Sequence, residues 1–168
     1  MKQLAILGSS GDIATAEESQ LASELGSLAA QSGYTCLVGG DDGIMGAAAR
    51  AAFKESGQVV AVLASGKSLG SAREFAAVIK TGLPFGTFSQ VLLSSCDAAV
   101  VIGGGAGTLA EICFAYLNDI PLAVLGADSI LSRLIADEIL PDNRKLRKIP
   151  VYRDCRGLLA WLKGQFGH

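Results

Sequence analysis

The chain has 168 residues; half of them are hydrophobic, 18% are charged, and the formal net charge is −2. This composition supplies a large apolar core and excludes an intrinsically disordered chain, so we expect one domain over residues 1–168. The small net charge does not support a nucleic-acid-binding protein. The N-terminal apolar run is too short for a signal peptide and no run is long enough to span a membrane, so we expect a cytoplasmic protein with no membrane partner.

Short apolar runs alternate with stretches of helical period along the whole sequence. In chain order, the sequence predicts a strand at 3–8, a helix at 16–33, a strand at 35–40, a helix at 44–56 and a strand at 58–64. A loop-rich connection at 65–86, with a short strand at 76–80, precedes a helix at 87–96, a strand at 98–103, a helix at 108–119, a strand at 121–126, a helix at 129–140, a strand at 149–154 and a helix at 156–166. Strands that are apolar on both faces, separated by amphipathic helices, predict a three-layer, Rossmann-like α/β fold with a mostly parallel sheet and helices on both faces.

The cysteines and the single histidine offer little chemistry. The four cysteines lie in or beside apolar segments without metal-site spacing, at Cys36, Cys96, Cys113 and Cys155. In a reducing compartment they are most simply small hydrophobic side chains. His168 is the last residue. We therefore expect no Ser–His or Cys–His mechanism and no metal site.

Three glycine-rich turns follow predicted strands, at 8–12 (GSSGD), 39–46 (GGDDGIMG) and 103–111 (GGGAGTLAE). Ligands of parallel sheets bind beyond the carboxyl ends of the strands, and glycines followed by a helix N-terminus can hold an anion with backbone amides. Thr108 is expected to cap the helix or to donate to the ligand. The predicted ligand-binding residues are Gly8, Ser9, Ser10, Gly39, Gly40, Asp41, Gly43, Gly103, Gly104, Gly105, Ala106, Gly107, Thr108 and Glu111.

Charged residues leave two questions open around these turns. Asp41 and Asp42 either cap the helix that starts near Ile44 or bind a sugar hydroxyl, an amino group or a divalent cation. No Lys or Arg occurs between Lys80 and Arg133, so a cation for a bound anion must come from another segment. The candidates are Lys67, Arg73 and the basic segment 143–156, which can also be an ordinary solvated surface.

The segments GGDDGIMGAAARAA (39–52) and DAAVVIGGGAGTLAEI (97–112) resemble the LOG-like, or lysine-decarboxylase-like, Rossmann superfamily. The second is similar to its G-G-x-G-T-x-x-E signature, and its form looks closest to the molybdenum cofactor carrier proteins of that superfamily. The resemblance implies a carrier of a phosphorylated, nucleotide-like ligand, with the molybdenum cofactor as cargo and molybdoenzymes or cofactor-synthesis proteins as partners. It also implies a homodimer or homotetramer.

Enzymes of the LOG type, which are nucleoside 5′-monophosphate phosphoribohydrolases, are the alternative that the resemblance implies. Gly104, Gly105, Gly107 and Thr108 would then take the phosphate, and Glu111 would face the ribose or polarise the reacting centre. These enzymes carry an arginine where this chain has Phe88 on or near the position, with Ser89 beside it. A missing charge-assisted contact costs roughly 100-fold in rate, so we favour binding over turnover.

Glu111 is expected beside a buried stripe formed by Leu109, Ile112, Cys113 and Tyr116. We interpret it as a carboxylate that accepts hydrogen bonds from a ligand; the structural alternative is a favourable interaction with the helix dipole. A third hypothesis for the protein as a whole is a nucleotide-sensing regulator that acts on a partner protein.

Overall fold

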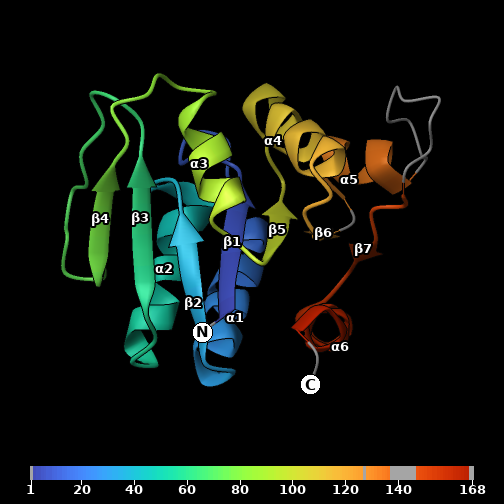
Figure 1. The fold of residues 1–168 in the computed structure, drawn as a ribbon. Helices are drawn as coiled ribbons and strands as arrows, with labels where there is room; N and C mark the ends of the chain where they lie inside the picture. Colours follow the sequence, from blue (N-terminus) through green and yellow to red (C-terminus); the bar gives the residue numbers. More distant parts are fainter. Residues whose placement is uncertain (1, 127, 137–146, 167–168) are drawn as a thin grey trace.

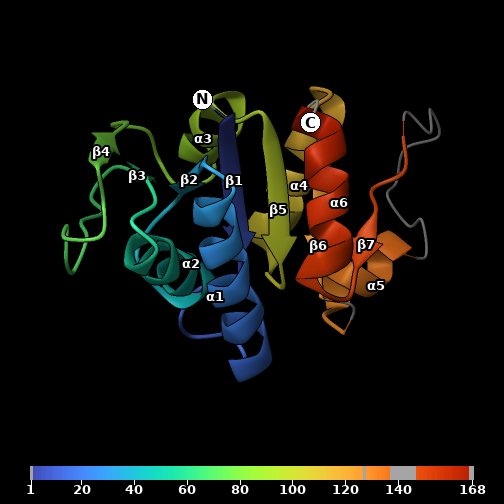
Figure 2. The same ribbon diagram turned by 90° about the horizontal axis from the view of Figure 1, so that it is seen from below.

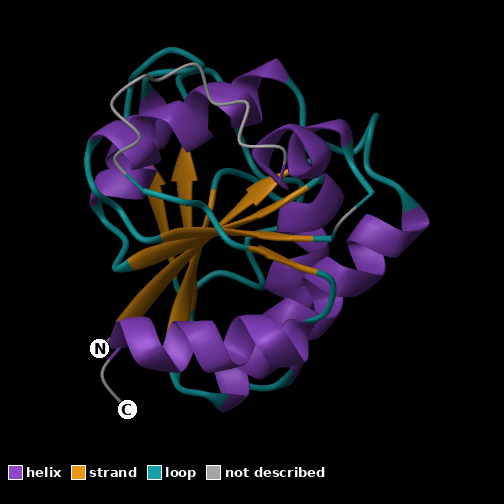
Figure 3. Cartoon of the chain, turned by 90° about the vertical axis from the view of Figure 1, so that its right-hand side faces the viewer, coloured by secondary structure: helices purple, strands orange, loops and turns teal. Residues whose placement is uncertain are grey.

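The computed structural model describes residues 2–126, 128–136 and 147–166. In these residues a parallel sheet lies between two layers of helices (Figures 1 and 3). The described strands are β1 (Lys2–Gly8), β2 (Tyr34–Val38), β3 (Val59–Leu63), β4 (Ala77–Lys80), β5 (Ala98–Ile102), β6 (Leu122–Leu125) and β7 (Val151–Tyr152). The described helices are α1 (Ala16–Gln31), α2 (Gly43–Lys54), α3 (Phe88–Ser94), α4 (Ala106–Leu117), α5 (Ile130–Ala136) and α6 (Cys155–Phe166). The predicted three-layer α/β architecture is confirmed.

The strand order across the sheet is β4-β3-β2-β1-β5-β6-β7, and every pairing is parallel. Strand β1 pairs with β2 on one side and β5 on the other, with Leu4 opposite both Cys36 and Ala98. Strands β2 to β4 are therefore added on one side of β1 and strands β5 to β7 on the other, so the strand order reverses between β1 and β5. In open α/β sheets this switch point is where ligands bind, beyond the carboxyl ends of the strands.

Both faces of the sheet are buried because successive side chains of a strand point to opposite sides. Leu4 and Ile6 of β1 belong to a core beneath α1, α2 and α6, whereas Ala5 and Leu7 belong to a core beneath α3, α4 and α5. Figure 2 shows α1 and α2 side by side on the first of these faces. This arrangement explains why the central strands read as continuous apolar runs.

Some element boundaries differ from the sequence prediction. Helix α4 begins at Ala106 rather than at 108, because Gly105 adopts the extended conformation of an N-cap residue. The last strand is shorter than predicted and contains only Val151–Tyr152. Helix α5 begins at Ile130, one residue after the predicted start, and the remainder of the predicted helix, 137–140, lies outside the described residues.

None of the helices among the described residues is both long enough and apolar enough to cross a membrane.

Gly8→Ala is expected to lower the free energy of unfolding by roughly 3 kcal/mol or more. Gly8 has φ +147°, and a Cβ atom there would lie 1.8 Å from the carbonyl oxygen of Ile102 on the neighbouring strand. The measurement is urea unfolding followed by circular dichroism. Gly33→Ala is the matched control, because Gly33 also has a positive φ (+73°) but no atom within 4 Å of the added Cβ. We expect it to cost about 1–2 kcal/mol; equal losses in the two variants would contradict the steric explanation.

Candidate functional site

Ser9 joins the three glycine-rich turns at the carboxyl edge of the sheet. Its hydroxyl accepts a hydrogen bond from the amide of Gly104 at 2.7 Å, and its own amide donates to the carbonyl of Ile102 at 3.1 Å. Its carbonyl accepts from the amide of Ile44, at the start of α2, at 3.1 Å. Ser9 is only 2% exposed. It therefore connects the end of β1 to the segments that follow β2 and β5.

Several of the predicted glycines are required by contacts within the protein. A Cβ atom on Gly104 would lie 2.4 Å from the Thr108 hydroxyl, and one on Gly43 would lie 2.3 Å from the carbonyl oxygen of Ser9. Gly105 and Gly107 differ, because an added Cβ would meet only the side chains of Ile13 and Phe85, at 3.8 and 3.5 Å. Gly104 and Gly43 thus allow the turns to pack closely, whereas Gly105 and Gly107 leave space in front of α4.

A cavity of about 360 Å³ lies in front of these turns. Its lining residues come from the three turns, from the segment after β3 and from the start of α3. Of the predicted binding residues, the lining includes Gly8, Ser10, Gly39, Gly40, Asp41, Gly105, Gly107, Thr108 and Glu111. The other predicted residues, which the lining does not include, are Ser9, Gly43, Gly103, Gly104 and Ala106. Their assignment as ligand contacts stays a prediction.

The helix N-termini at this edge are not equivalent. Helix α1 is closed by a capping box, in which the Thr15 hydroxyl accepts from the amide of Glu18 and the Glu18 carboxylate accepts from the amide of Thr15. The Ile44 amide of α2 is bonded to Ser9. Helix α4 has Gly105 as its N-cap, without a side-chain cap, and its first turn lines the cavity. The first amides of a helix have no carbonyl partner within it, so α4 presents donors there.

Thr108 does not cap α4, so that part of the prediction was wrong. It lies inside the first turn of the helix, is 6% exposed, and donates from its hydroxyl to the Gly8 carbonyl at 3.5 Å. Because it also lines the cavity, its role as a ligand donor stays a prediction.

Glu111 is half-buried at the cavity wall, on the second turn of α4. Burial raises the pKa of its carboxyl group to about 7, and the hydroxyl of Ser89 acts in the opposite direction. Phe88, 6% exposed, lines the same cavity from the start of α3. Thus Phe88 and Ser89 stand near Glu111 where the resemblance implied an arginine.

Asp41 and Asp42 do not cap α2. Asp42 occupies the N-cap position, but its side chain makes no capping hydrogen bond. One carboxylate oxygen of Asp41 instead accepts hydrogen bonds from the amides of Gly70 and Ser71, at 2.6 and 3.4 Å. Asp41 therefore binds the loop that follows β3.

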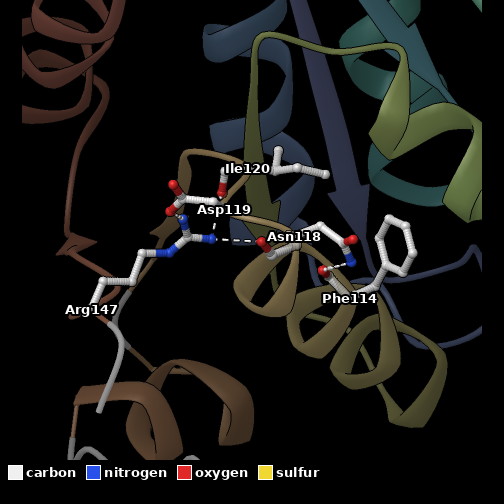
Figure 4. Close-up of polar contacts among 6 residues, drawn as sticks. Phe114, Asn118, Asp119, Ile120 and Arg147 are labelled. Carbon is white, nitrogen blue, oxygen red and sulfur yellow. Dashed lines mark hydrogen bonds and ion pairs between the residues drawn. The ribbon is translucent and has the colours of Figure 1, made fainter. Parts of the chain in front are cut away.

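The three predicted sources of a cation for the site lie in different places in the structure. Lys67 lines the cavity. Arg73 lies over the ring of Phe53, 5.8 Å from its centroid. Arg147, from the basic segment, forms an ion pair with Asp119 and donates to the carbonyls of Ala115 and Ile120 (Figure 4). It thus binds at the C-terminal end of α4, away from the cavity at the helix N-terminus; residues 143–146 lie outside the described part.

Sequence reasoning missed the apolar part of the cavity. The unforeseen apolar lining residues are Leu7, Ile13, Met45, Leu63, Ala64 and Phe85. Phe85 is 74% exposed, and its ring centroid lies 5.9 Å from that of Phe88. The one available signal was a large aromatic residue in a loop between Pro84 and Gly86.

The cysteines have the environment expected of small hydrophobic side chains. Cys36 and Cys155 are buried, and burial raises the pKa values of the Cys36, Cys96 and Cys155 thiols to about 12. Among the residues that the structure describes, no group of three or more His, Cys, Asp or Glu side chains is placed to hold a metal ion.

The sequence model of the SLOG cluster4 family matches residues 1–150. A curated relative, an uncharacterized protein of Archaeoglobus fulgidus, is 35% identical over 100 residues. This alignment covers 59% of the chain and 64% of the relative, so the chain spans just under two thirds of that protein's length.

Three solved structures share the fold over nearly their whole length. The X-ray structure of TM1055, a structural genomics target, has a TM-score of 0.84 and 28% identity, with 98% of this chain and 99% of that chain covered. The molybdenum cofactor binding protein of Rippkaea orientalis has a TM-score of 0.84 and 24% identity, with coverages of 97% and 96%. The molybdenum cofactor carrier protein of Chlamydomonas reinhardtii has a TM-score of 0.83 and 23% identity, with 99% of both chains covered.

The stability contributed at Glu111 is expected to fall as the pH rises. Its pKa in the folded state, about 7, exceeds the ordinary value of 4.5, so between these values the folded state binds more protons than the unfolded state. The contribution is fully present below pH 4.5 and is lost as the pH passes 7. Relative to Glu111→Gln, the wild type should lose roughly 2–3 kcal/mol of unfolding free energy across this window.

Urea unfolding at several pH values between 4.5 and 8 measures this change, with Glu17→Gln as the control for loss of an exposed carboxylate. A difference between wild type and Glu111→Gln that is constant with pH would contradict the effect of burial.

Proposed function

The chain belongs to the SLOG cluster4 family, and we propose that it is a carrier that holds a phosphorylated, nucleotide-sized ligand at the carboxyl edge of the sheet. The observation that carries this proposal is the cavity of about 360 Å³ in front of the uncapped N-terminus of α4. Its volume is within the range of small-molecule sites, roughly 300–1,000 Å³.

Backbone amides of α4 would bind the phosphate. The helix has twelve residues, so its dipole favours an anion at this end. Gly105 and Gly107 lack the side chains that would separate a ligand from these amides. The amide of Gly104 is already bonded to Ser9. We therefore expect the phosphate to contact the amides from Ala106 onward.

The apolar walls would bind a flat ring. Ile13 lies next to Gly105 and Phe85 next to Gly107, and the two side chains remain 52% and 74% exposed. Exposed aromatic and aliphatic side chains at a cavity favour stacking against a planar ring. Glu111 and the exposed Asp42 supply acceptors for its N–H groups. A pterin or a purine has this combination of features.

We propose the molybdenum cofactor, a pterin with a terminal phosphate, as the cargo. Support comes from the cavity and from the two structural neighbours that are named for binding or carrying this cofactor. Molybdoenzymes or cofactor-synthesis proteins would be the partners, and a homodimer or homotetramer in the cytoplasm is part of the same proposal.

Binding without turnover is favoured by the surroundings of Glu111. An efficient N-glycosidic hydrolysis needs stabilisation of the charge that develops in the transition state. Phe88 and Ser89 stand near Glu111, and neither carries a positive charge. The phosphoribohydrolase reaction is therefore the less favoured alternative.

Gly107→Asp is expected to weaken capture of the molybdenum cofactor at least 10-fold, because it adds a carboxylate at the phosphate position. An added Cβ at Gly107 has room, so the variant should fold. The measurement is native mass spectrometry of the protein mixed with purified cofactor, with Gly164→Asp as the control because its position on α6 is open.

The same preparation, incubated with AMP and assayed for free adenine, separates carrier from enzyme. Adenine released in proportion to protein concentration, and lost in Glu111→Gln, would overturn the carrier proposal. If Gly107→Asp and the wild type capture the cofactor equally well, the phosphate does not bind at the N-terminus of α4.

Phe85→Ala is expected to weaken binding of AMP by roughly 5-fold or more, because it removes a stacking surface of the ring. Binding of inorganic pyrophosphate, which has no ring, should change less than twofold. Isothermal titration calorimetry measures both, with Leu117→Ala as an exposed apolar control on the outer surface of α4. Equal losses for the two probes would contradict a ring-binding role.

A further inference from the structure

We propose that Lys67 pairs with the phosphate of the bound ligand and that Asp41 is a positioning residue, which holds the loop carrying Lys67 at the cavity. The inference rests on the proposed function and deepens it by naming the charge contact of the site. It also gives Asp41 a role other than ligand binding or helix capping.

The charges at the cavity single out Lys67. Among the described residues of the cavity lining, Lys67 is the only lysine or arginine, and the acidic residues there are Asp41, Asp42 and Glu111. No ion pair of Lys67 is present among the described residues, so its ammonium group is available to a ligand. Apart from Lys67, the charged side chains of this lining are all carboxylates, which repel a phosphate when they are ionised.

Hydrogen bonds hold the loop at both ends. At its beginning, the amide of Ser65 donates to the carbonyl of Leu83 at 2.7 Å, and the amide of Lys67 donates to the carbonyl of Ala64 at 3.2 Å. At its far end, the amides of Gly70 and Ser71 donate to the carboxylate of Asp41. Lys67 lies between the hydrogen bond of Ser65 and those of Gly70 and Ser71. The loop that begins at the end of β3 is thus attached, near its far end, to the turn that follows β2.

Asp41 is an unexpected residue for an anion site if only its charge is considered. A carboxylate near a phosphate opposes its binding, and removing the charge should strengthen binding. If Asp41 holds the loop, however, its loss releases Lys67, and binding should weaken. The neighbouring Asp42 lines the same cavity but makes no cap hydrogen bond. Removing its charge should therefore only reduce the repulsion of the phosphate. The two aspartates therefore give opposite predictions for the same chemical change.

The experiment measures dissociation constants for AMP and adenosine by titration calorimetry, at low and high salt. The wild type should prefer AMP. Lys67→Met should weaken AMP about 10-fold or more and leave adenosine within twofold, while reducing the salt dependence of AMP binding. Lys67→Arg should retain the preference for AMP.

Neutralising the two aspartates provides the matched comparison. Asp41→Ala, which removes both the charge and the acceptor of the Gly70 and Ser71 amides, should weaken AMP binding by roughly 3-fold or more, whereas Asp42→Ala should strengthen it. Hydrogen exchange adds a direct measure of the loop, because the amides of Gly70 and Ser71 should exchange faster in Asp41→Ala and not in Asp42→Ala.

Each result has a defined meaning. Tighter AMP binding in Asp41→Ala would overturn the positioning role. Unchanged AMP binding in Lys67→Met, with the wild type still preferring AMP, would overturn the charge contact and leave the proposed function intact. A wild type that binds AMP no more tightly than adenosine would overturn the proposed function together with this inference.

Discussion

The close contact between the ends of β1 and β5 is the constraint on which the site depends. At Gly8 the two strands leave no room for a side chain, since a Cβ there would collide with the Ile102 carbonyl oxygen. This contact places Ser9 where its three backbone and hydroxyl hydrogen bonds reach Ile102, Gly104 and Ile44. Because Ser9 is buried, these bonds are shielded from water, and losing one would leave a buried polar group unpaired. The position of α4 relative to the first turn therefore follows from the close approach at Gly8 and the hydrogen bonds of Ser9.

Behind the cavity, the turns pack closely against each other. In front of it, backbone amides remain available to hydrogen-bond a ligand. Gly104 and Gly43 serve the first role, whereas Gly105, Gly107 and the first turn of α4 serve the second. This division explains how one glycine-rich turn can be both rigid and able to bind. Rigid donors lose little entropy when a ligand binds, which favours affinity.

The charge balance of the cavity is unusual for an anion site. Asp41 is engaged with the loop at Gly70, and burial raises the pKa of Glu111 to about 7, so its negative charge is incomplete at neutral pH. Lys67 adds a positive charge from a separate segment. The electrostatic character of the site is therefore set by contacts between segments, and the net charge of the chain does not reveal it.

Much of the fold followed from the sequence alone, because apolar periodicity and glycine position depend on local chain geometry. The alternation of apolar runs and amphipathic segments predicted the three layers and almost every element. The motifs at 39–46 and 103–111 indicated which edge of the sheet forms the cavity, and the described cavity includes nine of the fourteen predicted residues. Only the tertiary structure decided what each side chain does there. Ser9 connects the turns, Asp41 binds a loop 29 residues further along the chain, and Arg147 binds the opposite end of α4. These roles depend on distances between residues remote in the sequence, and such distances exist only once the strands have paired.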